Sequence, residues 1–76
     1  MIKLYVYDAL KFKYKAEIKE AETNIINYVT NSVGVAEHPN IIESIDLLVD
    51  KLANAEDKLR TLEDWYKKIG EGKWAY

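Results

Sequence analysis

The feature that most constrains the fold is a regular spacing of apolar residues between positions 40 and 69. The steps between them alternate four and three without a break, and the residues are Ile41, Ile45, Leu48, Leu52, Ala55, Leu59, Leu62, Tyr66 and Ile69. This spacing is typical of the a and d positions of a coiled coil, whereas side chains on one face of a strand recur every two residues. The sequence therefore predicts one long helix over residues 40–69, about 45 Å in length at 1.5 Å per residue.

Signals at both ends support these bounds. Asn40 is a good N-cap residue, and Glu43 follows at the third helical position. Lys67 and Lys68 lie in the last turn, where positive charge is favoured, and Gly70 follows as a stop signal.

So long a helix exceeds what a chain of 76 residues needs to cover its own core. We expect the apolar seam to pair with the same helix of a second copy, and the expected dimer seam comprises Ile45, Leu48, Leu52, Ala55, Leu59, Leu62, Tyr66 and Ile69. Charges beside the seam favour a parallel homodimer. Lysines occupy the g positions and glutamates the e positions, so that opposite charges would meet across a parallel pair, and these residues are Lys51, Lys58, Glu56 and Glu63.

The N-terminal third has a different pattern. Every even position from 10 to 18 is apolar while charged residues fill the odd positions. Period two indicates strands, so we predict a β-hairpin over 2–19 with Phe12 and Tyr14 buried, and a short helix over 23–31 capped by Thr23. With a loop over 32–39 and an aromatic tail over 70–76, the fold class is α+β in one domain.

An all-α helical hairpin is the alternative. It makes residues 9–31 one helix and leaves Phe12 facing water, because helical spacing also relates Leu10, Tyr14, Ile18, Ala21, Ile25 and Val29. The β-hairpin is preferred because it accounts for all five apolar side chains from position 10 to position 18.

Composition limits the classes of function. The chain has no cysteine, which excludes disulfides and thiolate zinc sites, and its one histidine, His38, leaves little for acid–base chemistry. Its three glycines form no phosphate-binding motif. We expect no enzyme activity, no cofactor and no metal. No apolar run approaches about eighteen residues, and the N-terminus has no signal pattern, so we expect a cytoplasmic protein.

Two charged surfaces are candidate binding sites. On the predicted strands, cations alternate with aromatic rings, as in single-stranded nucleic-acid binders, at Lys3, Tyr5, Tyr7, Lys11, Lys13, Lys15 and Lys19. Strand lysines also discourage aggregation, and the net charge of −2 favours that interpretation. On the long helix, carboxylates recur every seven residues at the outer f position. A partner-binding surface would comprise these and the C-terminal aromatic residues, namely Glu43, Asp50, Asp57, Asp64, Trp65, Trp74 and Tyr76.

In composition, this short, cysteine-free chain rich in Lys, Asn, Ile and Tyr resembles small accessory proteins of bacteriophages that infect low-GC bacteria. The resemblance implies a non-catalytic protein, acting in the host cytoplasm, that modulates a host factor. We therefore hypothesise a dimeric interaction protein that binds and inhibits or adapts a host macromolecule. A small single-stranded nucleic-acid-binding module and a structural assembly subunit are the alternatives.

Overall fold

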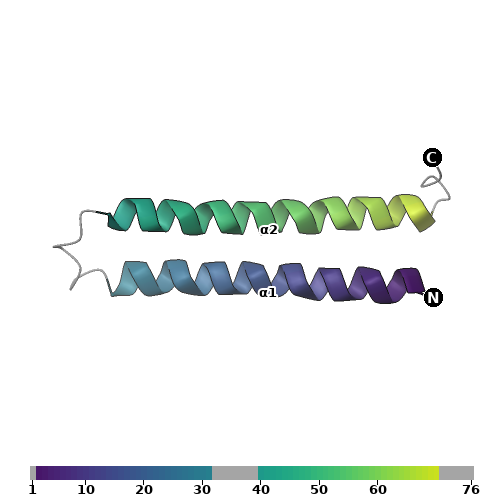
Figure 1. The fold of residues 1–76 in the computed structure, drawn as a ribbon, viewed down its shortest axis with the longest axis horizontal. Helices are drawn as coiled ribbons and strands as arrows, with labels where there is room; N and C mark the ends of the chain where they lie inside the picture. Colours follow the sequence, from purple (N-terminus) through teal and green to yellow (C-terminus); the bar gives the residue numbers. More distant parts are fainter. Residues whose placement is uncertain (1, 32–39, 71–76) are drawn as a thin grey trace.

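The computed structural model describes residues 2–31 and 40–70, and this part of the chain forms two antiparallel helices. Helix α1 spans Ile2–Thr30 and helix α2 spans Ile41–Gly70. Figure 1 shows them side by side, with the start of α1 and the end of α2 at the same end of the molecule. The Cα radius of gyration is 17.2 Å. A compact chain of this length would have a radius of about 11 Å, so the hairpin is a rod.

The preferred α+β fold is wrong, and the all-α helical hairpin is the alternative that the structure confirms. One helix, α1, covers both the range 2–19 predicted as a β-hairpin and the range 23–31 predicted as a separate short helix. Phe12, predicted to be buried, is 65% exposed. Tyr14 is half-buried, on the side of α1 that packs against α2. The predicted loop over 32–39 lies outside the described residues.

The alternation from position 10 to position 18 misled because a helix can produce it as well. Leu10, Tyr14 and Ile18 are four residues apart and share one helix face, which Ala21 and Ile25 extend. The other even positions fall on the opposite face. Helix α1 contains neither glycine nor proline, so nothing in its sequence stops the helix at the expected turn near residue 8.

Local hydrogen bonds mark the C-terminal end of α1 and the N-terminal end of α2. At the end of α1 the Asn31 backbone N–H donates to the Asn27 carbonyl oxygen at 3.0 Å, and the Asn31 amide donates to the Asn27 side-chain oxygen at 2.7 Å. At the start of α2 the Ser44 N–H donates to the carbonyl oxygen of Asn40 at 2.9 Å. Helix α2 therefore begins where the sequence places a cap.

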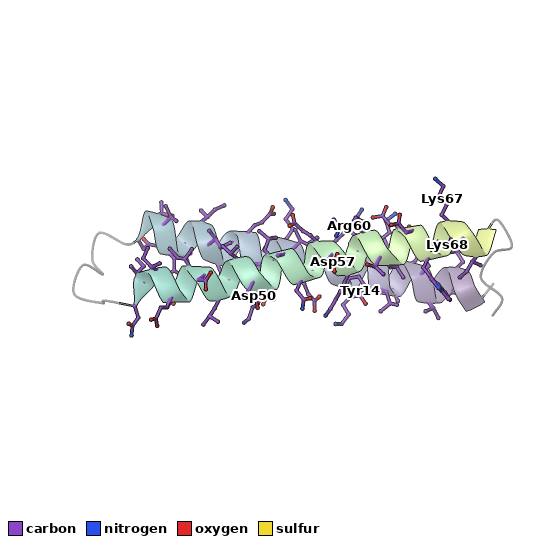
Figure 2. All side chains as sticks on the ribbon, turned by 90° about the horizontal axis from the view of Figure 1, so that it is seen from above. Tyr14, Asp50, Asp57, Arg60, Lys67 and Lys68 are labelled. Carbon is purple, nitrogen blue, oxygen red and sulfur yellow. The ribbon has the colours of Figure 1, made fainter. Side chains whose placement is uncertain are left out.

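The seam of α2 packs along α1. All nine of its residues are buried or half-buried, whereas the other described side chains of α2 are exposed apart from that of Ser44. The face of α1 that meets it contains Tyr7, Leu10, Tyr14, Ile18, Ala21 and Ile25. Figure 2 shows the two helices crossing at a shallow angle, as helices joined by a heptad seam do. The heptad pattern is thus used inside one chain.

Two alanines lie at the centre of this interface. Ala21 and Ala55 are 4% and 3% exposed, and they line the same recess between the helices. A methyl side chain lets two helix backbones approach closely. No large side chain in the described residues is fully buried, because two helices make a core only one layer thick.

The central contact predicts the effect of a larger residue. Replacing Ala55→Leu adds volume at the most buried position of α2, and we expect it to lower the free energy of unfolding by about 1–3 kcal/mol. Ala53→Leu is the matched control, because Ala53 is an exposed alanine of the same helix. Urea unfolding followed by circular dichroism measures both variants, and equal midpoints for the two would contradict the close packing.

Candidate interaction surfaces

The predicted dimer seam lies in the contact between α1 and α2. The helix that packs on it is α1 of the same chain, which runs beside α2 along its length. The rings of Tyr7 and Tyr66 stack near the open end, with centroids 4.0 Å apart and an interplanar angle of 20°. Stacked aromatic pairs contribute about 0.5–1.5 kcal/mol beyond the area they bury.

Lysine side chains reinforce the same contact. The Lys58 Nζ of α2 lies 5.8 Å from the ring centroid of Tyr14 in α1, and the Nζ of Lys13 lies at the same distance from that ring. The Nζ of Lys11 lies 5.6 Å from the Tyr7 ring. A cation over an aromatic face is attracted by the ring quadrupole. Of these three contacts, only that of Lys58 with Tyr14 joins the two helices, whereas Lys11 and Lys13 lie near rings of their own helix.

The g-position lysines of α2 have opposite charges near them within the chain. Lys51 and Lys58 line a recess of about 290 Å³ together with Glu17 and Glu20 of α1, above the two buried alanines. The lysines that suggested a parallel homodimer can therefore equally face carboxylates of α1, which runs antiparallel to α2 and has a different sequence.

The basic and aromatic surface predicted for nucleic acid depended on strands, and on a helix its residues spread over several faces. Lys11, Lys15 and Lys19 follow one another at steps of four, whereas Lys13 lies on another face, with its Nζ 3.1 Å from a carboxylate oxygen of Glu17. Tyr5 is exposed while Tyr7 lies in the helix interface. The side chain of Lys3 lies outside the described ones. The predicted positions therefore do not share one face of α1.

The acidic line is intact. All four f-position carboxylates are exposed on α2, at Glu43, Asp50, Asp57 and Asp64. Figure 2 shows Asp50 and Asp57 along this helix, with Arg60 close to Asp57. Asp57 pairs with Arg60, and the other three carboxylates share the same outer face. Trp65 is 41% exposed, and Trp74 and Tyr76 lie outside the described residues.

Most of the exposed apolar side chains were not predicted from the sequence as binding residues, Tyr5 and Trp65 being the exceptions. Eleven large ones are exposed in the described residues, and they are Leu4, Tyr5, Val6, Phe12, Ile26, Tyr28, Val29, Ile42, Leu47, Val49 and Trp65. Single exposed apolar residues are ordinary, but contiguous ones indicate interaction sites. Three of those on α1, at positions 5, 12 and 26, are separated by multiples of seven, a signal that was present in the sequence.

No family model, curated protein or solved structure matches this chain. Among residues 2–31 and 40–70, neither helix has a stretch long and apolar enough to cross a membrane. The same residues contain no group of three or more side chains suited to holding a metal ion.

The tyrosine stack gives a second prediction. Tyr66→Ala removes one ring of the pair and opens the end of the interface, so we expect it to lower the free energy of unfolding by about 1–3 kcal/mol. Leu47→Ala is the control. It removes a large side chain from the exposed side of α2 and should change the free energy of unfolding by less than about 0.5 kcal/mol. Thermal unfolding of both variants tests this, and a smaller loss for Tyr66→Ala than for Leu47→Ala would refute it.

Proposed function

We propose that this chain is a non-enzymatic interaction protein that self-associates and binds a basic surface of another macromolecule, inhibiting or adapting it. The compositional resemblance to phage accessory proteins is consistent with a partner from a host cell. The proposal rests on the amount of surface that the hairpin leaves open.

The accessible surface of the chain is 6186 Å². A compact monomer of 8.8 kDa would expose about 4,800 Å². A rod of two helices exposes more surface for its mass than a compact domain, and eleven large apolar side chains of residues 2–31 and 40–70 lie exposed on it. A chain of this size gains little stability from its own core, so association is the available source of more.

The two outer faces of the hairpin differ in chemistry. The outer face of α2 carries the four f-position carboxylates, whereas the corresponding face of α1 carries aromatic, aliphatic and small residues. Opposite faces of different character support two kinds of contact in one molecule. The acidic face favours a partner of positive charge, since complementary charge steers association and excludes partners of like charge.

Self-association is tested by sedimentation equilibrium at tens of micromolar. We expect a mass near twice the 8.8 kDa of the chain, because each copy leaves apolar surface that a second copy can cover. A mass of 8.8 kDa throughout that range would refute the dimer.

The partner is tested by affinity capture with the purified chain, before and after nuclease treatment of the lysate. The matched control replaces the acidic line by Glu43→Gln, Asp50→Asn, Asp57→Asn and Asp64→Asn, which keeps the shape of these exposed side chains and removes their charge. We expect a protein that survives nuclease, is retained by the wild type and is lost from the control. Retention of the same proteins by both, or loss of all bound material with nuclease, would contradict the proposed contact.

A further inference from the structure

Helix α1 has a second apolar pattern on the side away from α2. Its steps alternate four and three over the whole helix, as they do in the α2 seam, through Tyr5, Ala9, Phe12, Ala16, Lys19, Thr23, Ile26 and Thr30. All eight side chains are exposed. We call this set the outer seam of α1. Seven of its eight members are uncharged, in a chain of which 32% of residues are charged.

The large members of the outer seam are among the most exposed apolar side chains of the molecule. Tyr5, Phe12 and Ile26 are 68%, 65% and 65% exposed. They alternate with the small residues Ala9, Ala16, Thr23 and Thr30. Alternating large and small positions are what two helices need to interdigitate. An outer helix face built only for water would carry charged residues, as the outer face of α2 does.

We propose that α1 of a second copy covers the outer seam in antiparallel orientation, so that the dimer is held by α1 against α1 with α2 outside. This inference deepens the proposed self-association and rests on it. The seam from residue 5 to residue 30 is about 38 Å long at the helical rise. It therefore offers a contact along the full length of α1.

Side-chain size supports the antiparallel orientation. When the two seams overlap fully and run in opposite directions, every large residue meets a small one. The pairs are Tyr5 with Thr30, Ile26 with Ala9, Phe12 with Thr23, and Lys19 with Ala16, each occurring twice about the two-fold axis. In a parallel pair each residue would meet its own copy, which places ring against ring and methyl against methyl.

Charge leads to the same orientation. Lys19 is the only charged member of the outer seam, and its side chain is 84% exposed. A parallel pair would place the two Lys19 side chains opposite each other, whereas the antiparallel pair places each against Ala16 and leaves its stem free to reach solvent. Beside the seam, the antiparallel pair brings Lys13 to Glu20 and Lys15 to Glu22. A single polar seam residue of this kind fixes orientation at a cost in stability.

Sedimentation equilibrium of three variants tests the surface. Phe12→Lys should weaken dimerisation by at least about tenfold, since it places a charge in the apolar seam twice, once on each side of the two-fold axis. Lys19→Leu should strengthen dimerisation, because this substitution removes the one charged residue of the outer seam. Leu47→Lys, an equally exposed position on the outside of α2, should leave it unchanged. Circular dichroism of each variant checks that the exposed substitution has left the helices intact.

A fourth variant addresses the competing surface. Ile42 and Val49 are exposed on the flank of α2, seven residues apart, and a dimer could form there instead. Dissociation by Ile42→Lys with an unaffected Phe12→Lys would overturn the outer-seam dimer while leaving the proposed self-association in place. A monomeric wild type would overturn both, and the affinity capture would then decide the remaining part of the proposed function.

The orientation of the two α1 helices is tested with a nitroxide label on the Val6→Cys variant. The label attaches at this position alone, because the natural chain has no cysteine. Val6 is exposed beside the outer seam. In the antiparallel dimer the two labels lie about 35 Å apart along the axis, because the position opposite residue 6 is residue 29. In a parallel dimer the labels would be about 10 Å apart, the spacing of packed helices. Electron–electron dipolar spectroscopy distinguishes these two label distances, and the shorter one would refute the antiparallel orientation.

Discussion

The close approach of the two helices at Ala21 and Ala55 is the contact on which the hairpin depends. These are the only two buried apolar residues among the described ones, and Ala55 lies at the middle of α2. From there the interface continues in each direction through half-buried residues, to the Tyr7–Tyr66 stack at the open end. A two-helix structure has no second layer to bury its larger side chains completely, so its stability comes from the sum of many partial contacts along the rod.

Helix α2 was predictable because its sequence contains one pattern and clear ends. Nine apolar residues at alternating steps of four and three are compatible with no other regular structure, and Asn40 and Gly70 mark the ends within a residue of those observed. Which helix packs against this seam could not be predicted in the same way. A heptad stripe shows that a partner helix exists but not whether it belongs to the same chain, and that depended on the structure assigned to residues 2–31.

The helix over the N-terminal residues was predicted only as the alternative, because α1 has two apolar patterns. On a helix, residues two apart lie about 200° from each other, so an apolar residue at every second position populates two opposite faces. Tyr14 and Ile18 therefore face α2, while Phe12 and Ala16 face outward. In a strand the same residues would share one face. Period two over nine residues is thus ambiguous between a strand with one apolar face and a helix with two. The unbroken spacing of the outer seam through Ile26 and Thr30, well past the alternating stretch, is the signal that distinguishes them.

The candidate surfaces changed with the helix assignment. The lysines grouped on the predicted strand face are distributed around α1, and Lys11, Lys13 and Lys58 lie close to tyrosine rings of the helix interface. The acidic line kept its regularity because it was derived from the helix that was predicted correctly. Helix α2 has one continuous apolar seam, and α1 covers it, although Ile42, Leu47 and Val49 remain exposed elsewhere on α2. Helix α1 has two such seams, and only one of them has a neighbour among the described residues. This asymmetry gives a physical reason for a second copy to associate through α1 and leaves the carboxylates of α2 facing outward, where another molecule can reach them.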